Sequence, residues 1–209
     1  MYPKFFKRII DFILAAIILL FIWPFFLVII ICLHFSNKGA GVFFYQERPG
    51  KNEKIFKIIK FKSMTDECDS EGNLLDDDLR LTRIGKFIRT TSIDELPQLI
   101  NVLLGNMSFI GPRPLLPRYL PYYTDRERIR HTVRPGITGL SQVNGRNKMD
   151  WNSRLEMDVQ YVENMSFIGD IEIVFKTILN VIQKKDIEVV PTGKYLDEER
   201  CNNTTYNRL

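Results

Sequence analysis

The sequence predicts a mainly helical α+β chain with a small β-hairpin and an N-terminal membrane anchor. Residues 9–35 form an almost unbroken apolar run. Residues 42–64 contain two β-rich segments around a turn, and the second half of the chain carries apolar residues at helical spacing. We therefore expect an anchor in residues 1–36, a globular domain in residues 37–188 and a poorly ordered tail in residues 189–209.

The composition limits the classes of function. The 209 residues carry a net charge of +4 that is spread along the chain. This modest positive charge fits a membrane surface or a phosphorylated substrate, and it is too scattered to indicate nucleic-acid binding. The three cysteines, Cys32, Cys68 and Cys201, form no CxxC pair, so they predict neither a disulfide framework nor a zinc site. A reducing compartment is expected.

The apolar run is long enough for one spanning helix, which needs roughly 20 apolar residues. Pro24 lies near its middle, where proline removes a helical hydrogen bond. Basic residues, which mark the cytoplasmic side, flank both ends, with Lys7 and Arg8 before the run and Lys38 after it. A re-entrant hairpin that breaks at Trp23 and Pro24 and returns to the same side satisfies both observations. A single kinked span is the alternative.

The globular part divides into a hairpin and several helices. Residues 42–46 and 55–64 are expected to form the strands, and residues 66–78 form a polar loop. Helices are expected over residues 79–89, 94–104, 150–164 and 168–184. The apolar stripes of the last two helices favour core packing. Trp151, Tyr161 and the Arg-rich stretch 124–130 could lie at the headgroup level, as in interfacial helices.

Asp94 and Glu95 are adjacent carboxylates at the start of an expected helix. One interpretation is structural, because Asp is a favoured N-cap and Glu in the first turn suits the helix dipole. The other is chemical: an ionised aspartate near a divalent cation can attack phosphorus and form an aspartyl phosphate. The neighbouring acid could then orient the metal or a proton-bearing group.

Several arginines lie in settings suited to binding phosphate. Arg113 stands between two prolines, which rigidify the backbone and favour a fixed, two-pronged guanidinium. Arg89, Arg134 and Arg146 lie at a helix end or in Pro/Gly-rich segments. The glycines of residues 134–146 could bring backbone N–H groups close to a phosphate or ribose.

Together these segments resemble the bacterial sugar transferase family, whose members are monotopic phosphoglycosyl transferases. The most specific stretches are residues 93–114 (IDELPQLINVLLGNMSFIGPRP) and residues 134–146 (RPGITGLSQVNGR). Shorter matches are KRIID at residues 7–11, FYQERPG at residues 44–50 and KFKSM at residues 60–64. The resemblance covers roughly residues 1–185. One departure is Trp23, which stands where small members of the family have Ser before the helix-breaking proline.

The resemblance implies a reaction and a site. Asp94 would be the nucleophile on the β-phosphate of a UDP-sugar, releasing UMP, and Glu95 would complete an Asp-Glu dyad. Mg²⁺ would bind near Asp94 and neutralise the diphosphate. Four residues at matching positions would line the site: Lys60, Arg89, Arg113 and Asp170.

The resemblance also implies partners and a location. Undecaprenyl phosphate would accept the sugar phosphate, giving a polyprenyl diphosphate sugar as the first membrane step of glycoconjugate assembly. Downstream glycosyltransferases would be further partners. The catalytic domain is expected on the cytoplasmic face of the bacterial inner membrane, in contact with its lipids.

Two other classes of function remain open at this point. A non-enzymatic membrane adaptor would explain the anchor and the charge, but it leaves the Asp-Glu and Gly-Pro-Arg-Pro segments without a role. A glycosyltransferase that moves the sugar without its phosphate would release UDP instead of UMP.

Overall fold

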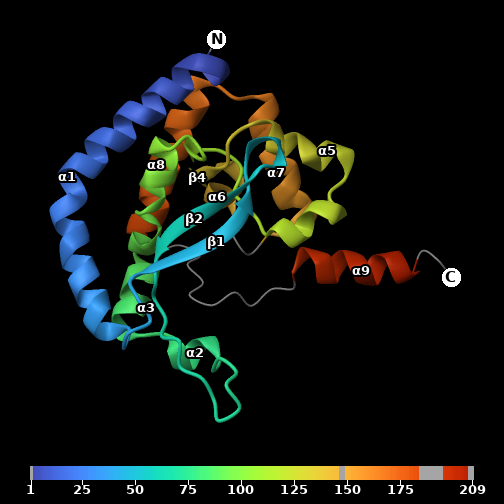
Figure 1. Cartoon of the computed structure of the whole chain (residues 1–209). Helices are drawn as coiled ribbons and strands as arrows, with labels where there is room; N and C mark the ends of the chain where they lie inside the picture. The colour runs from blue at the N-terminus through green and yellow to red at the C-terminus, as the bar shows by residue number, and fades with distance from the viewer. Residues whose placement is uncertain (1, 146–148, 184–194, 207–209) are drawn as a thin grey trace.

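The computed structural model describes residues 2–145, 149–183 and 195–206. These residues are mainly helical, with two small two-stranded sheets, and the long helix α1 forms one side of the molecule (Figure 1). The α+β class with a hairpin is therefore confirmed. The short elements outside the argument below are η1 (Tyr2–Phe6), η2 (Lys51–Glu53) and α6 (Leu140–Asn144).

Helix α1 (Lys7–Ser36) is continuous and contains Pro24. The predicted break at Trp23 and Pro24 is not confirmed, since the helix continues through both residues and bows outward as one arc (Figure 1). A proline removes one hydrogen bond and crowds the preceding turn, which can bend a helix without ending it. Among the described residues, α1 is the one helix long and apolar enough to cross a membrane.

Only the two ends of α1 are packed against the rest of the protein. Its buried residues are Lys7, Asp11 and Ala15 near the start and Ile29 and Leu33 near the end. Between these groups, the side chains of Leu20, Phe21 and Trp23 are more than half exposed. Both ends of the helix therefore rest on the same globular body, and its apolar middle is left uncovered.

The predicted hairpin is confirmed. Strand β1 (Phe43–Pro49) pairs antiparallel with β2 (Ile55–Phe61), from Phe43 opposite Phe61 to Pro49 opposite Ile55. Phe61 packs with residues of α1 and of α3 (Arg83–Thr90), and Ile58 packs against α4 (Gln98–Leu103). The hairpin thus joins the anchor to the two helices that flank the acidic pair.

The segment around Asp94 differs from the prediction of two helices. The first is divided into α2 (Asp77–Arg80) and α3 (Arg83–Thr90), and Thr82 caps α3. After α3, Ser92 adopts a left-handed conformation with φ of 56°. A single 3-10 turn, η3 (Ile93–Glu95), then precedes α4 (Gln98–Leu103). Asp94 lies inside this turn, so the interpretation of Asp94 as a helix N-cap is wrong.

A second sheet brings the two most specific stretches of the sequence together. Strand β3 (Ser108–Ile110) pairs in parallel with β4 (Gly136–Thr138). A Cβ at Gly136 would lie 2.1 Å from the backbone nitrogen of Gly111, and one at Gly139 would lie 2.1 Å from the Gly111 oxygen. Glycine at positions 136 and 139 therefore allows this loop to lie directly against the backbone of Gly111. From the sequence, we expected the glycines of this stretch to bring backbone N–H groups close to a phosphate or ribose instead.

The segment between β3 and β4 is built from short turns. These are η4 (Pro117–Tyr122), α5 (Asp125–Arg128) and η5 (Ile129–Thr132). Arg126 pairs with Glu156 and Glu163 at the surface, whereas Arg130 is buried. The expectation that the whole Arg-rich stretch lies at a headgroup surface is therefore wrong for Arg130.

The two predicted C-terminal helices are confirmed as α7 (Trp151–Glu163) and α8 (Phe167–Ile182). The apolar stripe of α7 is in the core, with Leu155 and Val159 fully buried. The stripe of α8 is not, because Phe175 is 63% exposed and Ile182 is 72% exposed. Core packing is thus right for α7 and wrong for α8, whose outer face is an exposed apolar surface.

Part of the expected poorly ordered tail forms a helix. Helix α9 (Leu196–Tyr206) begins at Leu196, whose side chain is fully buried. Leu196 packs in a cluster that contains Leu115, Tyr119, Tyr123 and Leu155. Leu196 therefore attaches this part of the tail to the globular domain.

Candidate active site

The acidic pair occupies the turn between α3 and α4, facing strand β2. Lys60 is on β2, and its Nζ lies 2.7 Å from Oε1 of Glu95. The Arg113 guanidinium approaches the same carboxylate oxygen at 3.6 Å. Both side chains of the Lys60–Glu95 pair are about one-fifth exposed, so this pair is accessible from outside.

Asp94 has an unusual ionisation. Burial and the adjacent Glu95 carboxylate raise the pKa of Asp94 to about 6, while Lys60, Arg89 and Arg113 act in the opposite direction. Three cations therefore stand close to one carboxyl group that is only half-buried. A perturbed carboxyl among cations in an accessible place is typical of functional sites.

Arg89 and Arg113 reach this turn from different elements. Arg89 is in the last turn of α3, and its Nε donates to the Ser63 hydroxyl at 2.8 Å. Arg113 follows β3, and its backbone carbonyl accepts a 2.6 Å hydrogen bond from Arg130. The Arg89 side chain and the Arg113 backbone are thus held by contacts outside the acidic pair.

Arg130 is a buried support for the Arg113 segment. Its exposed fraction is 2%, and it forms a 2.6 Å ion pair with Asp158 of α7. Asp158 also accepts a hydrogen bond from Ser141, and Arg130 donates to the Tyr123 hydroxyl at 3.3 Å. This network links α7, η5 and the Pro-Arg-Pro segment. The sequence carried no local signal for it, because its partners are far apart along the chain.

Arg48 is a further cation that the sequence reasoning did not assign to the site. It is half-buried on β1, donates to Gln46, and has a buried Nε without a hydrogen-bond partner. Burial and the charge of Arg113 lower the pKa of Arg48 to about 10. The next residues along the chain, Pro49 and Gly50, line a small cavity together with Arg113. In the sequence Arg48 belongs to the family match at residues 44–50, but it was not among the predicted site residues.

Two of the predicted site residues make their described contacts elsewhere. Arg134 donates from Nε to the Gly105 carbonyl at 2.7 Å, just beyond the C-terminus of α4, whereas Asp94 precedes the N-terminus of that helix. Asp170 lies 2.5 Å from Lys7 Nζ and accepts a 2.8 Å hydrogen bond from Tyr161. Asp170 thus ties α8 to the start of the anchor. Arg146 lies outside the described residues.

The acidic pair has the composition of a magnesium site that is completed by substrate. Mg²⁺ is usually held by one or two carboxylates together with substrate phosphates and water. Asp94 and Glu95 supply two carboxylates, and no group of three or more metal-binding side chains is found in the described part of the chain. The residues therefore fit a metal bound together with a diphosphate better than an all-protein cage.

Comparison with known proteins identifies the family. The model of the bacterial sugar transferase family matches residues 2–184. An uncharacterised sugar transferase of Bacillus subtilis, EpsL, is 49% identical over 182 residues, covering 87% of this chain and 90% of that protein. The exopolysaccharide production protein ExoY of Rhizobium meliloti is 38% identical over 189 residues, covering 82% of this chain and 83% of that protein.

A larger relative has a specific name. The UDP-glucose:undecaprenyl-phosphate glucose-1-phosphate transferase of Klebsiella pneumoniae is 41% identical over 183 residues. The match covers 83% of this chain but only 39% of that protein. This chain belongs to the bacterial sugar transferase family and is a transferase, which confirms the resemblance found in its sequence.

Proposed function

We propose that this protein transfers a sugar phosphate from a UDP-sugar to undecaprenyl phosphate, releasing UMP. The observation that carries the proposal is the half-buried Asp94 carboxyl, with its pKa near 6, among Lys60, Arg89 and Arg113. The name of the Klebsiella relative supports the substrate class. The product is a polyprenyl diphosphate sugar, the first membrane intermediate of glycoconjugate assembly and a substrate for downstream glycosyltransferases.

The proposed reaction has two displacements at one phosphorus atom. First, a carboxylate oxygen of Asp94 attacks the β-phosphorus, and the bond from this phosphorus to the bridging oxygen breaks. UMP leaves with that oxygen, and the sugar phosphate remains on Asp94 as an acyl phosphate. An oxygen of undecaprenyl phosphate then attacks the same phosphorus, which releases the Asp94 carboxylate.

The charges of the site are matched to this reaction. Near pH 7 a carboxyl group with a pKa near 6 is mostly ionised, as a nucleophile requires. Glu95 pairs with Lys60 and thereby fixes the ammonium beside the nucleophile. Asp94 and Glu95 would hold Mg²⁺, which supplies charge neutralisation of the diphosphate when bound.

We further assign Arg48 and Arg113 to diphosphate binding. A phosphate brings negative charge and hydrogen-bond acceptors to two guanidinium groups that otherwise repel each other. The unpartnered Nε of Arg48 indicates that its hydrogen-bonding capacity is not used by the protein. The two arginines would then balance the two negative charges of the diphosphate in a UDP-sugar.

The anchor geometry supports a re-entrant topology on the cytoplasmic face of the inner membrane. Both ends of α1 pack on one globular body and the exposed apolar middle extends away from it. Lipids would cover this middle and the exposed apolar face of α8. A bowed helix that enters and leaves on one side would hold the acidic pair near the headgroup plane, where the lipid phosphate lies.

The test is product identification with full-length protein in detergent or native membrane particles. Wild type and Asp94→Asn are supplied with Mg²⁺, undecaprenyl phosphate and a panel of UDP-sugars. Release of UMP by wild type, and its loss in Asp94→Asn and with EDTA, is the expected result. Release of UDP would favour the glycosyltransferase alternative, and binding to vesicles without turnover of any sugar would favour the adaptor.

A further inference from the structure

Helix α9 lies outside the part of the chain that matches the family, which ends at residue 184. It nevertheless joins the core next to the phosphate-binding segment. Leu196 is fully buried against Leu115, Tyr119 and Tyr123, and Leu115 is two residues from Arg113. Leu196 therefore packs on the chain segment that continues directly from the site.

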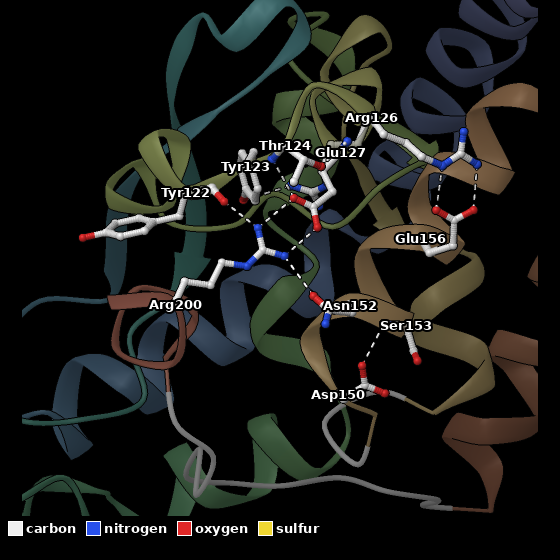
Figure 2. Close-up of polar contacts among 11 residues, drawn as sticks. Tyr122, Tyr123, Thr124, Arg126, Glu127, Asp150, Asn152, Ser153, Glu156 and Arg200 are labelled. Atoms are coloured by element: carbon white, nitrogen blue, oxygen red, sulfur yellow. Dashed lines mark hydrogen bonds and ion pairs between the residues drawn. The ribbon is translucent and has the colours of Figure 1, made fainter. Parts of the chain in front are cut away.

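A polar contact fastens the same helix to α5 and α7. Figure 2 shows Arg200 reaching from α9 toward Glu127, Asn152 and the backbone of Tyr122. Its two terminal nitrogens lie 2.6 and 2.8 Å from the two carboxylate oxygens of Glu127. Paired, two-pronged contacts of this kind define orientation as well as adding binding energy.

A second contact lies at the start of α9. The Arg118 guanidinium is 3.2 Å from the Asp197 carboxylate and stacks over the ring of Tyr195 at 4.3 Å. Arg118 belongs to η4, which lies between Leu115 and Tyr123. Polar and apolar contacts thus fix α9 to both ends of the segment that follows Arg113.

A short series of contacts continues from this segment to the acidic pair. Tyr123, which belongs to the same buried cluster as Leu196, accepts a hydrogen bond from Arg130, and Arg130 donates to the Arg113 carbonyl. The Arg113 side chain then approaches Glu95 at 3.6 Å. Displacement of α9 would open the cluster around Tyr123 and remove one support of the Arg113 backbone.

We propose that α9 is a positioning element that holds Arg113 in the orientation needed to bind the diphosphate of the nucleotide-sugar. This inference rests on the proposed function and adds a role for a segment beyond the family match. Residues of α9 act through Arg113 and do not contact the substrate. Undocking α9 raises the KM for the UDP-sugar about tenfold or more, since small displacements of binding groups have large kinetic effects. The KM for undecaprenyl phosphate and the kcat change less.

Leu196→Asp tests the proposal in the full-length protein, because an isolated carboxylate is not tolerated in an apolar cluster. Arg200→Ala is a second variant that removes only the polar contact, and Leu196→Met is the conservative rescue. Arg126→Ala is the matched control. Like Arg200, Arg126 is paired with carboxylates, in its case those of Glu156 and Glu163 on α7, but it has no described contact with α9 (Figure 2). Initial rates of UMP release give KM for each substrate and kcat.

Docking of α9 is measured independently through Trp151. Its ring meets Tyr119 edge-on at 5.5 Å, beside the cluster that contains Leu196. In a Trp23→Phe background Trp151 is the only tryptophan of the chain, and Leu196→Asp is expected to shift its emission to longer wavelength. Leu196→Met and Arg126→Ala should retain the wild-type emission. The emission wavelength of Trp151 reports the docking of α9 without requiring catalysis.

The outcomes separate this inference from the proposed function. A shifted Trp151 emission with a raised KM for the UDP-sugar in Leu196→Asp and Arg200→Ala supports positioning. A shifted emission with unchanged KM overturns it, as does a fall in kcat alone, which signals a smaller fraction of folded enzyme. Unchanged emission in both variants also overturns it, because α9 is then not docked. If wild type releases no UMP from any sugar, the proposed function fails and this inference with it.

Discussion

Replacing Asp94 by Asn should abolish sugar-phosphate transfer and at the same time stabilise the fold. The difference between the ordinary carboxyl pKa of 3.8 and the value of about 6 in the folded protein corresponds to about 3 kcal/mol. Solvent screening of a half-buried group reduces this to about 1–2 kcal/mol. The folded protein binds the Asp94 proton more tightly than the unfolded chain does, so stability is lost as pH rises through about 6. A neutral amide avoids this loss.

The assay is thermal unfolding of both proteins in detergent without Mg²⁺, at pH 4 and pH 8. For a chain of this size 1 kcal/mol corresponds to about 2–4 °C in Tm, so Asp94→Asn should unfold about 2–8 °C higher at pH 8. The two proteins should be nearly equal at pH 4, where the carboxyl is protonated. Asp78→Asn, at an exposed carboxyl outside the site, is the control. An Asp94→Asn protein less stable than wild type at pH 8, or equally stabilised at both pH values, would refute the reasoning.

Further predictions concern the groups around the nucleophile. The kcat/KM for the UDP-sugar should fall about tenfold per pH unit below about pH 6, because Asp94 must be ionised to attack; a profile flat to pH 5 would contradict this. Glu95→Gln should move the midpoint of that profile to lower pH, since Glu95 raises the pKa of Asp94; an upward move would be inconsistent. Arg48→Ala should raise the KM for the UDP-sugar about tenfold or more, the cost of a lost charged hydrogen bond, in initial-rate measurements; an unchanged KM would remove Arg48 from the site. Asp158→Ala should lower the free energy of unfolding by about 3–5 kcal/mol, because it leaves Arg130 buried and unpaired; denaturant titration measures the loss, and one below 1 kcal/mol would show that the pair is relaxed or hydrated.

The elements with strong local signals were predictable from the sequence. The apolar run, the β-hairpin, α7 and α8 all carry a periodicity or a turn composition that belongs to one type of structure. Periodicity shows which face of a helix is apolar, but it does not show what that face contacts. The stripe of α7 is buried and that of α8 is exposed, although both satisfy the same spacing. The difference depends on tertiary packing.

The site was predictable only in part for a similar reason. The resemblance directed attention to Lys60, Arg89 and Arg113, and the structure brings them to Asp94. The match at residues 44–50 includes Arg48, but it did not assign this residue to the site. Arg134 and Arg146 looked alike as cations in one glycine-containing stretch, yet Arg134 binds a backbone carbonyl beyond the far end of α4. Whether a surface arginine meets substrate depends on long-range contacts that local composition does not encode.

The predicted break at Trp23 and Pro24 was not confirmed, for a different reason. The prediction treated proline as the end of one helical arm and the start of another. Strongly apolar residues on both sides keep the helix continuous, so the chain curves instead of breaking. Both ends of α1 still pack on the same globular domain, because the curvature is spread over the exposed middle of the helix.

The most direct test of the account follows the β-phosphorus of the nucleotide-sugar. Full-length protein is mixed with a UDP-sugar labelled with ³²P at the β-phosphate, first without and then with undecaprenyl phosphate. The account predicts label bound covalently to Asp94 before the lipid is added, unlabelled UMP in solution, and transfer of the label to the lipid afterwards. Label released as UDP, or equal protein labelling in Asp94→Asn, would contradict it.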